Sequence, residues 1–320
     1  MSTKAMSPAP VDPELDAYNA KVAATVPRMA VASVSSRRER QEAVMRAFPP
    51  SPDDVARTEH WVTLPGRELY VRVYRPATGR LPALLYLHGG GWIAGSVQSH
   101  DGICAALARD ADVVVASVHY RRPPENPCPA PNDDAYAALV WLAAQADALE
   151  VDAGRLAIGG DSAGAHLAAG AALEARERGG PPLRLQLLIY PVVAPSFDTP
   201  SYRQQAVTAT LTRDDMIVYW DLYAPGGAAT ADWRARPGEA ALAGVAPAHI
   251  VVAGLDPLHD EGVTLASRLR DAGVAAALVE CPTLTHGFLR AAPYARAARA
   301  AQLAIGEAVA ATLHGASRRR

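Results

Sequence analysis

The pattern of apolar and polar positions divides the chain into short strand-like runs and longer helical stretches. After residue 55, eight short runs rich in β-branched and other apolar residues are predicted as strands: residues 59–64, 69–74, 83–88, 113–118, 156–160, 185–190, 249–254 and 276–281. The first two alternate apolar and polar residues around "PGRE", which predicts a hairpin at one edge of a sheet. The later runs are almost continuously apolar, as expected for parallel strands that are covered on both faces.

Helical patterns occupy the segments between and after these strands. They fall at about residues 99–109, 132–148, 163–178, 260–272 and 292–313. Strands that alternate with helices form crossover units, and crossover units build a mostly parallel sheet flanked by helices. The fold class predicted from this rhythm is therefore α/β, with a mostly parallel sheet of eight strands.

Two regions depart from the alternating rhythm. Residues 1–50 carry helical patterns without a strand, and residues 195–235 are far longer than a usual connection between strands. The second region contains "LTRDDMIVYWDLY" (211–223), in which Thr212 is expected to cap the N-terminus of a helix. We predict that both regions fold together as a helical cap over one end of the sheet. The corresponding division is 1–50 for the first part of the cap, 51–194 for the first part of the core, 195–235 for the cap insertion and 236–320 for the rest of the core.

Composition and charge narrow the classes of partner. The formal net charge is −2, which gives no electrostatic reason to expect nucleic acid or an anionic membrane as a partner. The three cysteines form no CxxC pair, so neither a disulfide framework nor a metal site is expected. The N-terminal residues lack the apolar segment of a secretory signal, and no run approaches the roughly 18 apolar residues of a membrane helix. A cytoplasmic location is the resulting expectation.

The strongest local motif is "GGDSAGAH" (159–166). Residues 160–164 fit the pattern G-x-S-x-G and lie between a predicted buried strand and a predicted helix. In a nucleophile elbow of this kind, a strained turn exposes the serine hydroxyl, here that of Ser162. The alternative is an ordinary glycine-rich turn between strand and helix, but the context favours a nucleophile.

A serine hydroxyl needs a base, and the base needs an acid to orient it. Nine histidines are available, and His286 in "THGF" stands out because it follows the last predicted strand, at the same end of the sheet as Ser162. The segment "GLDPLHDEG" (254–262) supplies the candidate acids. Asp256 comes first after its strand and is preferred, whereas Asp260 and Glu261 are expected in the first helical turn, where carboxylates favour the helix dipole.

The stretch "HGGGW" (88–92) follows another predicted strand and permits several interpretations. With the next residues it fits G-x-G-x-x-A, a dinucleotide-binding turn, but the following strand runs into "HYRR" and not into the expected carboxylate. The absence of G-K-[S/T] excludes a P-loop. A set of backbone donors for an oxyanion explains this loop and the serine motif together.

These motifs, in this order, resemble the hormone-sensitive-lipase-like branch of the α/β-hydrolases, the bacterial family IV esterases. "HGGGW" and "GDSAG" resemble its two signature blocks, "YRRPPENPCPAPNDD" (120–134) is similar to its "YRLAPE" segment, and "DPLHDEG" and "HGF" resemble its acid and base blocks. The resemblance covers about residues 55–310. It implies an α/β-hydrolase fold with a helical cap, built from the N-terminal helices and an insertion.

The resemblance also implies the roles of individual residues. Ser162 would be the nucleophile, His286 the base and then the acid, and Asp256 the residue that orients His286. It further implies oxyanion donors on the backbone of Gly90, Gly91 and Ala163, with His88 and Asp161 in support. Four aromatic residues are candidates either for pocket walls or for ordinary core packing: Trp92, Tyr190, Tyr219 and Trp220.

The function predicted from the sequence is therefore a serine carboxylesterase that acts on short- to medium-chain acyl esters through an acyl-enzyme. The expected partner is a small-molecule ester, no cofactor or metal is expected, and the resemblance makes a homodimer plausible without deciding it. An amide or N-acetyl hydrolase with the same residues is the first alternative. A non-catalytic receptor is the second, although receptors that resemble this family lose the histidine that His286 supplies here.

Overall fold

The structure of the protein is a computed structural model that describes residues 10–27, 33–48, 54–205, 210–227 and 232–315. Its strands form a single eight-stranded sheet with the order β1-β2-β4-β3-β5-β6-β7-β8. The strands are β1 (Ala56–Leu64), β2 (Arg67–Arg75), β3 (Leu81–Leu87), β4 (Val114–His119), β5 (Val151–Asp161), β6 (Leu183–Ile189), β7 (Ala248–Leu255) and β8 (Ala276–Thr285).

The sheet is parallel except at one edge. Strand β2 pairs antiparallel with both β1 and β4, and every other neighbouring pair is parallel. The predicted edge hairpin and the predicted mostly parallel sheet of eight strands are thus confirmed. Every residue of β3 is buried, which explains why its sequence is a continuous apolar run instead of an alternating one.

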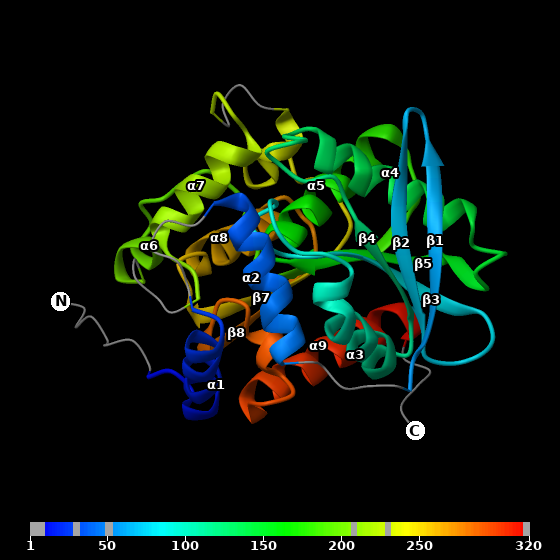
Figure 1. Cartoon of the computed structure of the whole chain (residues 1–320). Coiled ribbons are helices and arrows are strands. Elements are labelled where there is room, and N and C mark those ends of the chain that lie inside the picture. Colours follow the sequence, from blue (N-terminus) through cyan, green and yellow to red (C-terminus); the bar gives the residue numbers. More distant parts are fainter. Residues whose placement is uncertain (1–9, 28–32, 49–53, 206–209, 228–231, 316–320) are drawn as a thin grey trace.

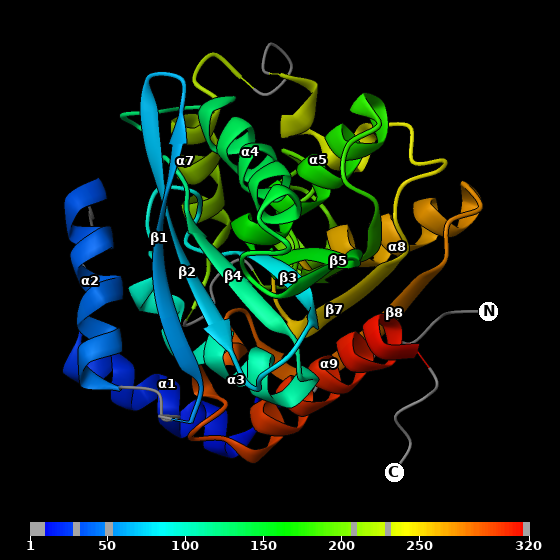
Figure 2. The same cartoon turned by 90° about the vertical axis from the view of Figure 1, so that its right-hand side faces the viewer.

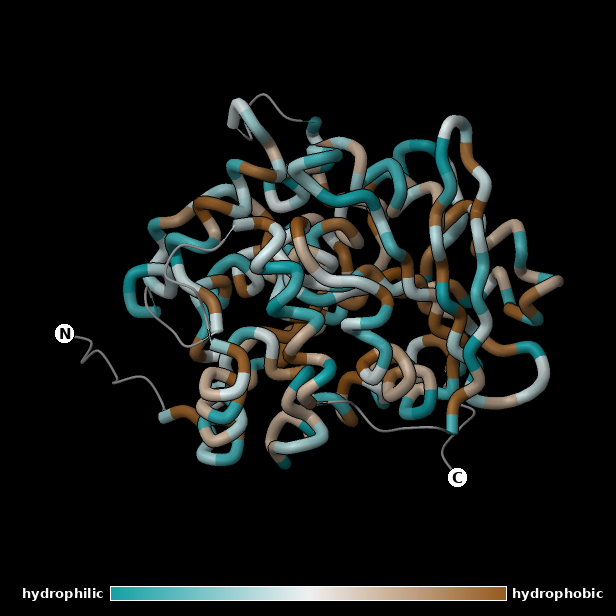
Figure 3. The backbone as a smooth tube through the Cα atoms, viewed as in Figure 1, coloured by the Kyte–Doolittle hydropathy of each residue, from teal (hydrophilic) through white to brown (hydrophobic). Residues whose placement is uncertain are grey.

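Helices cover both faces of the sheet (Figures 1 and 2). The helices of the core are α3 (Asp101–Ala111), α4 (Ala130–Ala144), α5 (Ala163–Arg178), α8 (His259–Asp271) and α9 (Arg296–His314). Figure 2 shows α3 and α9 on one face and α4, α5 and α8 on the other. Each face has its own hydrophobic core, and the apolar stretches of the backbone gather between these layers in Figure 3. The predicted helices therefore exist, although α9 begins four residues later than expected.

Four further helices come from the two regions that broke the alternating pattern. They are α1 (Pro13–Thr25), α2 (Val34–Ala47), α6 (Pro200–Gln204) and α7 (Arg213–Tyr223). Thr212 caps α7 as expected, because its hydroxyl accepts the N–H of Asp215 while the Asp215 carboxylate accepts the N–H of Thr212. The two regions also meet, since Arg37 of α2 forms an ion pair of 2.9 Å with Asp215.

Short 3-10 turns complete the described secondary structure: η1 (Gln98–His100), η2 (Trp233–Ala235), η3 (Pro237–Glu239) and η4 (Phe288–Ala291). Turn η1 leads from the loop after β3 into α3, and η4 lies between His286 and α9. The predicted division at residue 50 falls outside the described residues. Among the helices of the described ranges, none has the length and apolar character that crossing a membrane would require.

Candidate active site

Three side chains from three strand ends meet at the carboxyl edge of the parallel sheet. Ser162 follows β5, Asp256 follows β7 and His286 follows β8. His286 Nε2 lies 2.9 Å from Ser162 Oγ, and His286 Nδ1 lies 2.7 Å from Asp256 Oδ2. The three residues that the sequence singled out are therefore in one hydrogen-bonded chain.

The turn that carries Ser162 is strained and tightly enclosed. Ser162 has φ 56° and ψ −120°, a conformation that L-residues rarely adopt and that costs free energy unless the surroundings enforce it. A hydrogen bond of 2.9 Å from its N–H to the carbonyl of Ile189 fixes the turn against β6. A Cβ on Gly164 would overlap the carbonyl oxygen of Leu87, so only glycine lets α5 begin this close to β3.

A hydrogen bond from the backbone orients the Asp256 carboxylate toward His286. Its side chain is fully buried, and Oδ1 accepts the N–H of Leu258 at 2.9 Å, which leaves Oδ2 facing the imidazole. Because Oδ2 accepts the proton on Nδ1, the lone pair of Nε2 points toward the Ser162 hydroxyl. The geometry therefore suits His286 to receive a proton from Ser162.

The other two carboxylates of the same segment face residues 193–202, the segment after β6. Asp260 accepts the N–H of Ser201 at 2.9 Å. Glu261 is buried and accepts hydrogen bonds from the N–H groups of Val193 and Ala194 and from the Tyr202 hydroxyl. Burial raises the pKa of Glu261 to about 8, against the effect of these donors. Both residues lie in the first turn of α8 as expected, but their contacts with the segment after β6 were not predicted.

The glycine loop after β3 lies beside the Ser162 turn. Gly90 and Gly91 both have positive φ angles, 133° and 59°. A Cβ on Gly91 would come within 2.6 Å of the Tyr219 ring of α7, so the loop needs glycine both for its backbone angle and for this close approach. In the described part of the chain, the N–H groups of Gly90, Gly91 and Ala163 form no hydrogen bond. Such N–H groups are able to bind a ligand oxygen.

A buried carboxylate joins the glycine loop to the serine turn. Asp161, the last residue of β5, accepts the N–H of Gly89 at 3.0 Å and the Tyr86 hydroxyl at 2.9 Å. Burial opposes ionisation of this carboxyl group, but His100 and Arg290 nearby hold its pKa well below the usual range. Asp161 thus carries a negative charge that fixes the first amide of the loop.

His88 packs under the same loop. Its ring is buried and stacks on Tyr120 at a centroid distance of 4.3 Å, and the Tyr120 hydroxyl donates to the His88 carbonyl at 2.7 Å. Burial holds the pKa of His88 well below its ordinary value, so the ring is neutral. The ring therefore contributes packing under the loop and no charge.

Trp92 anchors the other end of the loop to helix α7. Its indole is buried, stacks on Tyr223 of α7 at 4.4 Å, and packs edge-on against Trp220 at 4.9 Å. Its Nε1–H donates to His166 Nδ1 at 3.2 Å, and His166 Nε2–H donates to the Ala235 carbonyl at 2.9 Å. Burial lowers the pKa of His166 to about 4, which keeps the neutral form that these two hydrogen bonds require.

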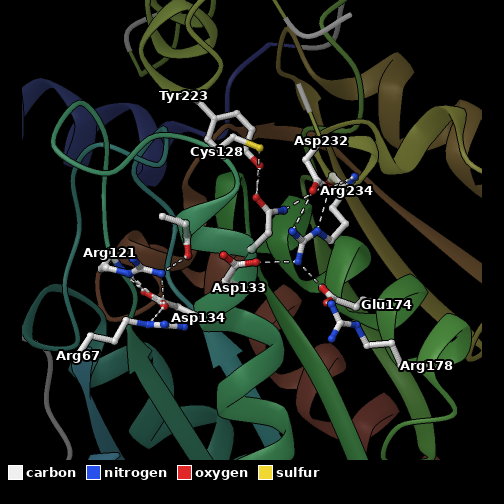
Figure 4. Close-up of polar contacts among 12 residues, drawn as sticks. Arg67, Arg121, Cys128, Asp133, Asp134, Glu174, Arg178, Tyr223, Asp232 and Arg234 are labelled. Carbon is white, nitrogen blue, oxygen red and sulfur yellow. Dashed lines mark hydrogen bonds and ion pairs between the residues drawn. The ribbon is translucent and has the colours of Figure 1, made fainter. Parts of the chain in front are cut away.

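A polar network continues from this aromatic group into the core (Figure 4). The Tyr223 hydroxyl donates to Asn132 of α4 at 2.7 Å, and the Asn132 amide donates to the carbonyl of Arg234 in η2. The Arg234 guanidinium contacts Glu174 of α5 at 2.8 Å and Asp133 at 2.9 Å. The end of α7 is thereby tied to α4 and α5, two of the helices that cover this face of the sheet.

The four aromatic candidates differ in exposure. Trp92, Tyr190 and Trp220 are buried, whereas Tyr219 is partly buried and faces Gly91. Tyr190 lies directly after β6 with a positive φ of 36°, and its ring is 4.7 Å from that of His286. Of the two roles predicted for these residues, Trp92 and Trp220 therefore have that of core packing.

No group of three His, Cys, Asp or Glu side chains suited to a metal ion occurs within the described ranges.

Comparison with known proteins places this geometry in a family. Residues 84–290 match the family described as having the alpha/beta hydrolase fold. The chain belongs to the α/β-hydrolase family, in the hormone-sensitive-lipase-like branch that its motifs predicted.

The chain is similar to several named esterases. It is 40% identical over 250 residues to carboxylesterase NlhH of Mycobacterium tuberculosis, covering 76% of this chain and 77% of that protein. It is 38% identical over 296 residues to ethyl acetate hydrolase of Pseudomonas putida, covering 88% and 92%. A crystal structure of a thermostable esterase from Pseudomonas putida superposes with a TM-score of 0.90 at 30% identity, covering 96% and 99%. The protein is accordingly a carboxylic ester hydrolase.

Proposed function

We propose that the protein hydrolyses short- to medium-chain acyl esters through an acyl-enzyme formed on Ser162. The observation that carries this proposal is the chain of two hydrogen bonds from Ser162 Oγ through His286 to Asp256. This chain supplies a nucleophile, a base in the right tautomer and a buried carboxylate that stabilises the imidazolium. The similarity to named carboxylesterases supports the same reaction class.

In the first half of the reaction, Ser162 Oγ attacks the ester carbonyl carbon while His286 Nε2 takes the hydroxyl proton. The negative charge that develops on the carbonyl oxygen is stabilised by the N–H groups of Gly90, Gly91 and Ala163. The carbon–oxygen bond to the alcohol then breaks, and the imidazolium returns its proton to the departing oxygen. The acyl group stays on Ser162.

In the second half, water attacks the acyl-serine carbonyl and gives a proton to His286 Nε2. The tetrahedral intermediate collapses, the proton passes to Ser162 Oγ, and the carboxylic acid leaves. Asp256 keeps the imidazole oriented throughout and stays ionised. The positive N-terminal end of α5, which begins at Ala163, favours the negative charge in both halves.

The proposal also covers the helical cap and its effect on substrate size. We assign α1, α2, α6 and α7 to a cap over the catalytic edge of the sheet, with Tyr219 of α7 at the wall beside Gly91. A wall this close to the oxyanion loop leaves limited space for substrate and supports a preference for small acyl groups. Rates over p-nitrophenyl esters of increasing acyl length measure that preference, and a steady rise beyond decanoate would contradict it.

The nucleophile is tested with Ser162→Ala. We expect a loss on the order of 10⁴-fold or more in kcat for p-nitrophenyl acetate, with an unchanged circular dichroism spectrum. Turnover near that of the wild type would end the proposal. The acid is tested with a matched pair: Asp256→Asn is expected to lower kcat by about 10³-fold or more, because it removes the carboxylate that stabilises the imidazolium. Asp260→Asn changes a carboxylate four residues away, and a larger loss from it would overturn the assignment.

A further inference from the structure

A cavity of about 170 Å³ lies beside the candidate active site, between the N-terminal helices and the helices α3 and α9. None of Ser162, Asp256 and His286 lines it. One part of its wall is apolar and comes from α2, α3 and η4: Val44, Phe48, Ile103, Ala106 and Leu289. The remaining wall includes three arginines, Arg109, Arg290 and Arg299.

The charges around this cavity leave an excess of positive charge. No aspartate or glutamate is among the described residues that line it. Arg109 and Arg299 share one carboxylate, that of Asp110, at 3.1 Å and 2.8 Å, and Arg109 also lies 3.8 Å from Asp54. Arg290 forms no ion pair with a carboxylate of the described chain, and its Nε has no hydrogen-bond partner there. An anion with an apolar tail complements such a wall.

A line of polar contacts leads from Arg290 to the glycine loop. Arg290 Nη2 lies 3.3 Å from His100 Nε2. His100 Nε2 also lies 3.3 Å from Asp161 Oδ1. Asp161 in turn accepts the N–H of Gly89. His100 Nε2 therefore faces a donor and an acceptor at once, and it serves only one of them in each protonation state.

His100 is held between these two groups through Ser99. His100 Nδ1 contacts Ser99 Oγ at 3.0 Å, and that hydroxyl donates to the Ser96 carbonyl. If Arg290 turns toward an anion in the cavity, His100 Nε2 loses its contact with Arg290 and keeps the one with Asp161. A change at Arg290 is thereby passed to Asp161 through the His100 ring.

We propose that this cavity binds a short-chain monocarboxylate through Arg290, and that binding acts on the glycine loop through His100 and Asp161. An apolar protein cavity of about 150 Å³ accommodates benzene, so a ligand of about six carbons in all suits this one. Hexanoate is the representative ligand. Under the proposed function such carboxylates are the acid products of the enzyme, and to that extent the proposal rests on that function and describes a product site outside the catalytic centre.

Binding is tested by calorimetric titration of hexanoate into the Ser162→Ala protein, where no ester chemistry takes part. We expect Arg290→Gln to weaken the Kd at least tenfold, because it removes the cation. Arg296→Gln is the matched control, since Arg296 is exposed and lies outside the cavity, and it should leave the Kd within twofold. Ala106→Leu should also abolish binding, because its larger side chain fills the cavity.

Hexan-1-ol has the same chain length without the carboxylate, so it shows how much of the binding depends on the carboxylate. We expect it to bind at least tenfold more weakly than hexanoate, and equal binding would overturn a carboxylate site. Retention of hexanoate binding in both Arg290→Gln and Ala106→Leu would place the ligand elsewhere and would equally overturn it. These titrations do not require an active Ser162, so their failure is distinguishable from failure of the proposed function.

The connection to the glycine loop is tested by steady-state kinetics with p-nitrophenyl acetate. Saturating hexanoate is expected to change kcat at least threefold in the wild type, because the loop contributes to the transition state. Ala106→Leu should keep the basal kcat and lose the response to hexanoate. A purely competitive effect of hexanoate, confined to KM and kept in Ala106→Leu, would overturn the connection.

Discussion

Two buried carboxylates flank the candidate active site and are held in opposite ways. Asp161 lies at the end of β5, and Glu261 lies in the first turn of α8. Asp161 accepts one backbone N–H and one tyrosine hydroxyl, and Glu261 accepts two backbone N–H groups and one tyrosine hydroxyl. His100 and Arg290 hold the pKa of Asp161 well below its usual range, whereas burial raises that of Glu261 to about 8.

The two carboxyl groups differ more in the side chains around them than in their number of hydrogen-bond donors. No described ion pair connects Glu261 to an arginine, a lysine or a histidine, so its donors do not compensate for the lost solvation. Asp161 acts as a fixed negative charge under the glycine loop. Glu261 acts as an acceptor that fastens the segment after β6 and helix α6 to α8.

The largest expected contrast is in activity. Asp161→Asn removes a charge that His100 and Arg290 face, and it loosens the first amide of the glycine loop, so kcat/KM for p-nitrophenyl acetate should fall about 100-fold. Glu261→Gln replaces a group with a raised pKa by a neutral group of the same shape and should cost less than about threefold. Both variants are compared by steady-state kinetics. Similar losses from the two substitutions would break the contrast.

The second contrast concerns stability and separates the hydrogen bonds of Glu261 from its charge. Glu261→Leu leaves two backbone N–H groups and the Tyr202 hydroxyl without an acceptor, and should lower the free energy of unfolding by about 3 kcal/mol or more. Glu261→Gln keeps an acceptor oxygen and should cost about 1 kcal/mol or less. Urea unfolding at pH 6 measures both. An equal loss of unfolding free energy in the two variants would show that these hydrogen bonds do not contribute to stability.

The third contrast is in pH dependence, and it has opposite signs for the two carboxyl groups. Glu261 binds its proton more tightly in the folded state, so its contribution to stability falls as pH rises from about 4.5 to about 8. Glu261→Gln should flatten the decline in unfolding free energy over this range. For Asp161 the lowered pKa puts the loss of stability below pH 3.8 on acidification. A steeper decline in Glu261→Gln would contradict the assigned protonation state.

The sheet and the three candidate catalytic residues were predictable because the pattern that specifies them is local. Continuous apolar runs mark the parallel strands, and Ser162, Asp256 and His286 each follow such a run. Parallel strands bring their carboxyl ends to one edge, so residues that are distant in sequence meet there without any knowledge of packing.

The two flanking carboxylates could not be assigned in the same way. Nothing near Asp161 in the sequence predicts the contact with His100 of η1, or the contact of His100 with Arg290 of η4. Glu261 was expected only to favour the dipole of α8, and its three donors come from the segment after β6 and from α6. Such contacts depend on three-dimensional packing between loops, which hydrophobic periodicity does not encode.

The stacking of Trp92 on Tyr223 has a consequence for how the proposed cap evolves and is engineered. A cap is commonly treated as an exchangeable module that selects substrates by size. Here α7 also supports one end of the glycine loop, so a transplanted or shortened cap would change the rate constant of the chemical step before it changed affinity. Substrate range in this protein is therefore easier to alter at residues of α7 that face away from Trp92.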